Sequence, residues 1–102
     1  MNEGIYVRFT GEVVRDPVQT TSKTGTKWTR IQCNVPVHSR ETGAERPTWV
    51  SIGLPGMRGE EIADIRAGDI VRVEGELRIY SYMKDGRSIM ALNVTPTSVE
   101  RD

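Results

Sequence analysis

The chain has 102 residues, the length of one domain, and its fourteen basic and fourteen acidic residues give a formal net charge of zero. This balance excludes a histone-like binder that depends on overall charge, although it allows a local basic groove. The single cysteine excludes an intramolecular disulfide and a cysteine-rich metal site, and no apolar run approaches the roughly 20 residues of a membrane span. Because no signal peptide opens the chain, we expect a cytoplasmic protein that does not associate with membranes.

Residues with a branched Cβ dominate the composition. Eleven Val and eight Ile stand against three Leu, and ten Thr add to them. Such side chains favour strands over helices. The composition therefore predicts a small all-β domain.

The first strand is predicted at residues 5–10, where apolar and polar side chains alternate. Gly11 marks a bend, and residues 13–15 continue the strand beyond it. Asp16-Pro17 ends the strand, because proline lacks an amide donor and restricts the residue before it. The polar segment 20–26 is interpreted as a loop or a loose hairpin.

The second and third strands are predicted at residues 27–37 and 48–54, separated by an exposed hairpin loop at 38–47. Alternation directs one set of side chains into the core: Ile31, Cys33, Val35, Val50, Ile52 and Leu54. The other set faces outward: Trp28, Arg30, Gln32, Asn34, Trp49, Ser51 and Gly53. Trp49 therefore stands on an outer face beside two small residues, which leaves room for a ligand against its ring.

A short helix is predicted at residues 57–66, after the third strand. Ile62 and Ile65 form its apolar face, and the acidic pair at 60–61 near its start suits the helix dipole. Gly68 is a natural end for this helix. We expect the helix to cover one end of the sheet.

The longest extended stretch is residues 69–95, which predicts a hairpin. Gly75 interrupts its first strand, where we expect a bend or a bulge. Asp85-Gly86 supplies the positive φ of a tight turn and forms the tip. The returning strand is predicted at residues 88–95, and residues 99–102 are expected to trail off.

The first strand of this hairpin has one apolar face and one polar, aromatic face. Alternation directs the apolar set into the core: Val71, Val73, Leu77 and Ile79. The opposite face carries Arg72, Glu74, Glu76, Arg78, Tyr80 and Tyr82. A hydrophobic core does not require two tyrosines beside the cations of Lys84 and Arg87. A surface that binds a flat, anionic ligand does require aromatic rings next to positive charges.

Five strands, with one short helix between the third and the fourth, follow the order of the OB-fold barrel, which commonly binds oligonucleotides. We therefore expect residues 1–102 to form a single five-stranded OB-fold domain. The fold alone does not prove a function.

Several pieces of the sequence, in their order and spacing, resemble the bacterial single-stranded DNA-binding proteins. They are Gly11-Glu-Val-Val-Arg-Asp-Pro17, Thr24-Gly25, Thr48-Trp49, Gly56, Ala67-Gly68-Asp69, Val71-Arg-Val-Glu-Gly-Glu-Leu-Arg78, Tyr82 and Asp85-Gly86. The resemblance extends from about Val7 to Val94 and implies an OB-fold that binds single-stranded DNA.

In that family, aromatic side chains stack on unpaired bases, while lysines and arginines contact the phosphates. The resemblance implies that Trp49 is the stacking tryptophan of the third strand and that Tyr82 is the stacking aromatic of the hairpin. Two aromatic residues of the family have no counterpart here. One would lie in the loop at residues 38–40, and the other would lie at the position of Pro55.

Other departures concern the basic residues and the end of the chain. Ser51 and Tyr80 stand where members of the family often carry arginine. Members usually end in a disordered linker and an acidic tip with a terminal phenylalanine, which the residues up to Asp102 lack. This leaves open a trimmed chain or a short relative without hub function. The length also resembles primosomal replication protein B, a dimeric OB-fold protein of replication restart.

The candidate binding residues are aromatic and basic side chains on the predicted outer faces. Trp49 and Tyr82 are the first candidates for base stacking, although Trp49 alternatively suits a subunit interface. Trp28 and Tyr80 suit either stacking or the cover of a barrel end or dimer contact. The candidates for phosphate contact are Arg30, Arg78, Lys84 and Arg87, with Arg8, Arg15, Lys27, Arg40 and Arg46 as weaker ones.

We expect sequence-nonspecific binding of single-stranded DNA in replication, repair or recombination, with RNA left open as a ligand. Self-association as a tetramer or dimer is expected, and replication or repair proteins are candidate partners. The alternative is a primosomal OB-fold protein that acts mainly through protein–protein contacts. The acidic residues are dispersed, and no nucleophile–base pair, phosphate-binding glycine loop or Cys/His ligand spacing is present, so we expect no enzymatic activity, metal or cofactor.

Overall fold

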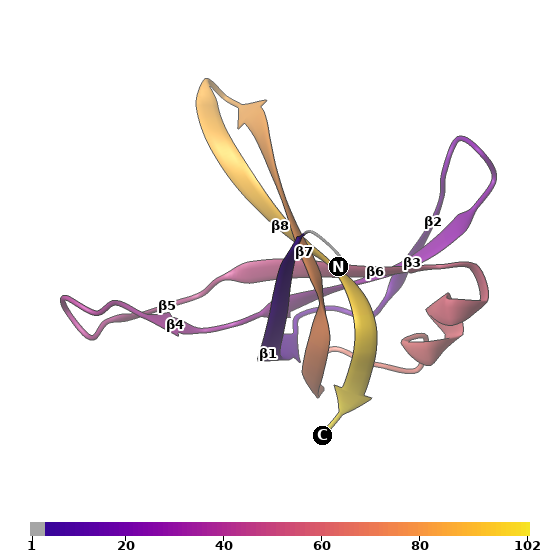
Figure 1. Cartoon of the computed structure of the whole chain (residues 1–102), viewed down its shortest axis with the longest axis horizontal. Coiled ribbons are helices and arrows are strands. Elements are labelled where there is room, and N and C mark those ends of the chain that lie inside the picture. Colours follow the sequence, from indigo (N-terminus) through magenta and orange to yellow (C-terminus); the bar gives the residue numbers. More distant parts are fainter. Residues whose placement is uncertain (1–3) are drawn as a thin grey trace.

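The computed structural model describes residues 4–102, and its secondary structure is almost entirely β (Figure 1). Its elements are β1 (Ile5–Val13), β2 (Val18–Thr21), β3 (Lys27–Asn34), β4 (Val37–His38), β5 (Glu45–Arg46), β6 (Trp49–Pro55), the 3₁₀ helix η1 (Gly56–Glu61), β7 (Ile70–Lys84) and β8 (Arg87–Arg101). The all-β class predicted from the composition is confirmed.

The strands of the main sheet pair in the order β1-β7-β8-β6-β3-β2, and β1 also pairs with β3. The β1–β3 pairing closes the order into a circuit of five strands, β1, β7, β8, β6 and β3. Within the circuit, β6 and β8 pair in parallel and the other neighbours pair antiparallel. The five strands predicted from the sequence are those of the circuit, and the three short strands lie outside it.

The core lies inside this circuit and consists of side chains that alternate with outward-facing ones. Strands β3 and β6 supply the buried side chains of Thr29, Ile31, Cys33, Val50, Ile52 and Leu54. The other members of the buried apolar cluster are Val13, Ile62, Ile65, Val71, Val73 and Val94. Val35 packs against this cluster and is partly buried, so the inward set predicted for the second and third strands is confirmed.

Two glycines lie where the pairing of the long strands changes. Directly after Gly11, β1 begins to pair with β3, while its pairing with β7 continues to Glu12; a Cβ on Gly11 would lie 3.1 Å from the Cβ of Cys33. At Gly75, the register between β7 and β8 shifts, and a Cβ would overlap the Thr95 carbonyl and the Pro96 backbone. The bend or bulge expected at Gly75 is confirmed by this register shift.

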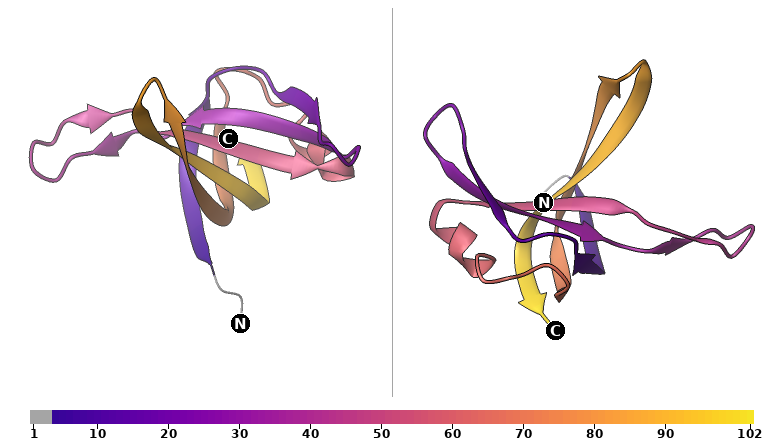
Figure 2. Two further views of the ribbon diagram at one scale, coloured as in Figure 1. Left: turned by 90° about the horizontal axis from the view of Figure 1, so that it is seen from above. Right: turned by 180° about the vertical axis from the view of Figure 1, so that it is seen from behind.

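Three hairpins project from the circuit (Figures 1 and 2). β2 pairs with the first half of β3, so the polar segment 20–26 belongs to a hairpin. β4 and β5 form a second hairpin, which occupies the predicted loop at 38–47 together with Val37; the second strand, predicted to reach residue 37, ends at Asn34. The third is the outer part of β7 and β8, residues 80–91, which within residues 4–102 pair only with each other. These residues are called the arm below.

The C-terminal residues differ from the prediction. β8 continues to Arg101, and Val99 pairs with Val73, so the expectation that residues 99–102 trail off is wrong. The fifth strand was predicted to end before Pro96, which in fact lies opposite Gly75, where the register shifts. Because the pairing is already interrupted there, the missing amide of proline does not end the strand.

The helix is in the predicted place, between the third and fourth strands of the circuit, but its type and length differ. It is a 3₁₀ turn over Gly56–Glu61 instead of a helix at 57–66, and the acidic pair at 60–61 lies at its end. Two glycines within six residues disfavour a longer helix. The dipole argument for the acidic pair is therefore wrong, while the two isoleucines of the predicted apolar face are buried.

Ile79 was predicted in the core but is 48% exposed. The pairing between β1 and β7 stops at Leu77, so β7 leaves the core beyond that residue. The alternation of faces is as predicted, but the core ends before the strand does.

Candidate functional site

The arm and the β2–β3 hairpin rise on the same side of β6 and β3 (Figures 1 and 2), and a groove of about 430 Å³ lies between them. Four strands line this groove, with Trp28, Arg30, Gly53, Arg78, Tyr80, Asn93, Val94 and Thr95. Four of the eight predicted binding residues are therefore brought together: Trp28, Arg30, Arg78 and Tyr80.

The strand register places the predicted residues on a single outer face. Gln32, Ser51, Asn93 and Arg78 are aligned partners in one row across β3, β6, β8 and β7. Aligned partners point to the same face, and so do residues two apart on one strand. The other predicted residues each lie an even number of positions from a member of this row on the same strand, so they share its face. They are Trp28, Arg30, Trp49, Tyr80, Tyr82, Lys84 and Arg87.

The arm presents its two tyrosines to solvent. Tyr80 and Tyr82 are 53% and 49% exposed and lie opposite Ala91 and Ile89 in the hairpin. Each ring is fixed at one end by the strand and leaves a surface open to a flat ligand. Tyr80 lines the groove, whereas Tyr82 lies farther out along the arm.

The tip of the arm carries two cations. Asp85 and Gly86 have φ values of 51° and 76°, as a two-residue type I′ turn requires, so the predicted turn is confirmed. Lys84 and Arg87 are the last paired residues before the turn. Their side chains therefore share the face of the two tyrosines and extend the cationic surface beyond the groove.

The β3 wall of the groove is a tryptophan covered by an arginine. The guanidinium carbon of Arg30 lies 5.2 Å from the centroid of the Trp28 ring, which is within the range of a cation–π interaction. Trp28 is partly buried and Arg30 is exposed. This wall therefore offers both a flat surface and a positive charge, opposite Tyr80 and Arg78 of β7.

The positive charge of the β7 wall is partly offset. Arg78 donates a hydrogen bond from Nε to the Glu76 carboxylate at 3.0 Å. This bond and the negative charge of Glu76 raise the pKa of Arg78, so the guanidinium remains charged. Within residues 4–102, Arg30 forms no ion pair with a carboxylate, which leaves its charge available to a ligand.

Trp49 lies on the same outer face but outside the groove. It is 52% exposed at the start of β6, opposite Asn34 of β3. Its neighbour two residues on, Ser51, belongs to the row that continues to Arg78. Trp49 therefore adds a ring to the face without forming a wall of the groove.

The five weaker basic candidates are separated by the fold. Arg15 donates to Gln32 at 2.6 Å and lines a hollow that shares Arg30 with the groove, so it extends the positive surface. Arg8 lies away from the groove and pairs with Glu74 at 2.7 Å. The others line neither hollow: Lys27, Arg40 and Arg46.

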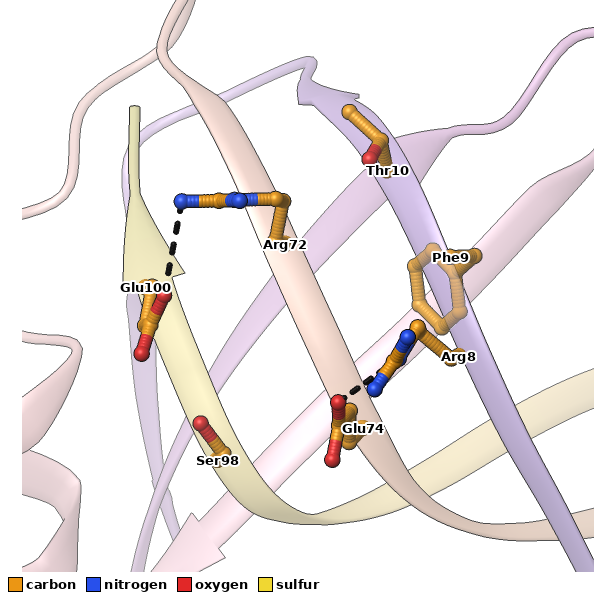
Figure 3. A pocket seen from close by; sticks show the side chains of 7 residues that line it. All are labelled: Arg8, Phe9, Thr10, Arg72, Glu74, Ser98 and Glu100. Carbon is orange, nitrogen blue, oxygen red and sulfur yellow. Dashed lines mark hydrogen bonds and ion pairs between the residues drawn. The ribbon is translucent and has the colours of Figure 1, made fainter.

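A larger hollow, of about 540 Å³, lies over β1, β7 and β8 on the other side of the Gly75 bend (Figure 3). Its arginines are neutralised by carboxylates, because Arg8 pairs with Glu74 at 2.7 Å and Arg72 with Glu100 at 3.5 Å. An anionic ligand gains little net attraction from such a surface. The smaller groove with the unpaired Arg30 is the better anion site.

Sequence reasoning missed two polar groove residues, Asn93 and Thr95. The signal that identifies Asn93 is the Asp85-Gly86 turn, because a two-residue turn fixes the register that pairs Asn93 with Arg78. No local pattern reveals that β8 lies parallel to β6, with Ser51 beside Asn93.

Other kinds of site find no support in the part of the chain that the structure describes. Within residues 4–102, no three His, Cys, Asp or Glu side chains are grouped to hold a metal ion. No helix in this range is long and apolar enough to cross a membrane. Cys33 is buried, and its burial raises the pKa of the thiol to about 11, so it is not a nucleophile at neutral pH.

Comparison with known proteins identifies a family and solved structures with a similar fold. The model of the single-strand binding protein family matches residues 5–102. No match was found among curated proteins. Among solved structures, the chain is similar to a small single-stranded DNA-binding protein from Streptomyces coelicolor, with a TM-score of 0.75 and 17% identity over 99% of this chain and 96% of that one. At this identity, the likeness shows a shared fold.

Proposed function

Because the chain belongs to the single-strand binding protein family over residues 5–102, we propose that it binds single-stranded DNA without sequence preference. Members of this family bind DNA and catalyse no reaction, so the chain is not an enzyme. In the proposed mode, bases stack on exposed rings and phosphates contact arginine and lysine. The circuit of five strands is taken as the OB-fold barrel that presents them.

The observation that carries this proposal is the groove between the arm and the β2–β3 hairpin. Trp28 and Arg30 of one wall face Tyr80 and Arg78 of the other. An unpaired strand exposes flat bases and a chain of phosphates, so a nonspecific binder needs rings and cations together. Because the chain has zero net charge, this local combination must supply the affinity.

We propose that the strand enters at the β2–β3 hairpin, crosses the groove and continues along the arm. The stacking residues would be Trp28, Tyr80, Trp49 and Tyr82, and the cations would be Arg30, Arg78, Lys84 and Arg87. Each stacked base contributes roughly 1–3 kcal/mol. Four phosphate contacts give a slope of about −3 for log K against log salt, since each contributes about −0.7 on single strands.

The proposed setting is DNA replication, repair or recombination in the cytoplasm, with replication or repair proteins as partners. RNA also exposes unpaired bases and phosphates, so it is proposed as a competing ligand. Competition between labelled oligo-dT and unlabelled oligo-U separates the two ligands, and equal displacement by RNA would remove the preference for DNA.

Self-association through β1 is proposed as well. Within the described residues, β1 pairs with β7 along one edge over residues 5–12, while β3 joins the other edge only at Glu12 and Val13. Ile5 and Tyr6, at the free end, are 55% and 54% exposed. A free strand edge pairs readily with the same edge of a second copy. The expected state is a dimer or a tetramer, and light scattering that gives a monomeric mass at micromolar concentration would refute it.

Titration with oligo-dT tests the proposed function directly. Stacking of bases should quench the tryptophan fluorescence, and the variants Trp49→Ala and Tyr82→Ala should bind more weakly while remaining folded. A protein that acts mainly through protein–protein contacts would leave the fluorescence unchanged. If both variants bind oligo-dT like the wild type, the assignment of these two residues is wrong.

A further inference from the structure

Arg30 and Trp28 both lie above the bare backbone of Gly53. A Cβ on Gly53 would lie 3.2 Å from Nη1 of Arg30, 3.6 Å from its Cγ and 3.5 Å from Cε3 of Trp28. Gly53 is the β6 partner of Arg30, and its φ is not positive, so the backbone conformation itself does not require glycine. The missing side chain instead leaves the space in which the arginine lies along the sheet.

The outermost flat group of this wall is the guanidinium of Arg30. It lies 5.2 Å from the centroid of the partly buried Trp28 ring, while Arg30 itself is exposed to the groove. A guanidinium is planar and stacks on aromatic faces, which an ammonium group does not do. A base that enters the groove therefore meets the Arg30 plane before it meets the Trp28 ring.

Building on the proposed function but revising two of its assignments, we infer that Arg30 is a base-stacking residue that covers Trp28 and is not a phosphate contact. Three cations then remain for the phosphates, and the expected slope of log K against log salt is about −2. Trp28 supports the guanidinium from behind, and Gly53 is the positioning residue that lets the side chain lie flat. The base stacks on the face of Arg30 that is turned away from Trp28, across the groove from Tyr80.

Two comparisons separate stacking from phosphate contact. Lysine at position 30 keeps the charge but loses the plane, so it preserves a phosphate contact and removes a stacking surface. An oligonucleotide of abasic sites keeps the phosphates but loses the bases. A stacking role for Arg30 therefore appears on oligo-dT and disappears on an abasic strand of the same length.

The experiment measures the affinity of the full chain for labelled oligo-dT and for a labelled abasic oligonucleotide, by fluorescence anisotropy. Arg30→Lys should weaken oligo-dT binding by about five-fold or more, the equivalent of the lower end of base stacking. Its binding to the abasic strand should equal that of the wild type. Arg72→Lys, which changes an ion-paired arginine away from the groove, serves as the control and should alter neither affinity.

Gly53→Ala tests the positioning role. Its Cβ would meet the flexible end of Arg30 first, so the guanidinium should move while the melting temperature stays at the wild-type value. The variant should reproduce the loss on oligo-dT, and it should have no further effect in an Arg30→Ala background because Gly53 acts through Arg30.

The outcomes separate this inference from the proposed function. When the wild type binds oligo-dT, two results for Arg30→Lys refute the stacking role. Either the variant binds both oligonucleotides like the wild type, or it loses affinity for both equally. If Gly53→Ala still weakens binding without Arg30, the positioning role is refuted. If the wild type does not bind oligo-dT, both the proposed function and this inference fail.

Discussion

Replacing Gly75 by alanine removes the space in which β7 bends between the circuit and the arm. The added Cβ would overlap the carbonyl oxygen of Thr95 and the Cα of Pro96 on β8. Both contacts are backbone atoms, and both residues belong to the strand that pairs with β7 on each side of the register shift. They can move away only if the pairing of the two longest strands is disturbed.

The expected loss follows from this geometry. Added methyl groups in a packed interior typically cost 1–3 kcal/mol. Because the backbone cannot yield as a side chain end does, we expect about 3 kcal/mol for Gly75→Ala, at the upper end of that range. For a domain of this length each kcal/mol lowers the melting temperature by about 4–8 °C, so the variant should melt roughly 12–24 °C below the wild type.

Thermal unfolding followed by circular dichroism measures this change. Gly53→Ala is a matched control, because its Cβ meets the mobile end of Arg30 and should change stability by no more than about 0.5 kcal/mol. If Gly75→Ala has the same melting temperature as the wild type and Gly53→Ala, the backbones do not approach closely at this bend and the reasoning is refuted.

Three further outcomes are expected. Tyr80→Ala and Tyr82→Ala should each weaken oligo-dT binding by roughly 1–3 kcal/mol at an unchanged melting temperature, because both rings are half exposed; wild-type affinity in an anisotropy titration would remove either residue from the site. Arg87→Ala should make the slope of log K against log salt about 0.7 shallower, and titrations at several salt concentrations that give the wild-type slope would exclude a phosphate contact. Burial raises the pKa of the Cys33 thiol from 9.0 to about 11 in the folded protein. The protonated thiol therefore stabilises the fold fully below pH 9, and this stabilisation is lost as the pH rises towards 11. The difference in unfolding free energy between the wild type and Cys33→Ala should therefore shrink over that range, and a difference that stays constant would contradict the raised pKa.

The sequence predicted the local features of the fold better than the extent of its strands. The Asp85-Gly86 turn and the Gly75 bend were predictable because each depends on the backbone freedom of one or two residues. The last strand was predicted to end at residue 95, whereas it continues past Pro96, because the effect of a proline depends on what lies opposite it. Ile79 was misplaced in the core because alternation gives the face of a side chain but not the point where a neighbouring strand ends.

The candidate site could be predicted residue by residue but not as an arrangement. Alternation placed Trp28 and Arg30 on one face of their strand, and Arg78 and Tyr80 on one face of another. That these faces line one groove depends on the parallel pairing of β6 with β8, which joins segments far apart in the sequence. The support of Arg30 by Gly53 depends on side-chain packing, which no sequence pattern expresses.

Among the described residues, the arm is supported by only its own two strands. Within residues 4–102, its backbone from 80 to 91 has no third strand on either edge, whereas residues 71–77 of β7 lie between β1 and β8. A ribbon of two strands is marginally stable in water, and such segments open at free energies well below that of global unfolding. Hydrogen exchange should therefore be fast in the arm and slow at its root, and it should slow in the arm only when a nucleic acid lies along it. In the proposed binding mode, the arm is therefore the part of the protein that adapts most readily to the course of the bound strand.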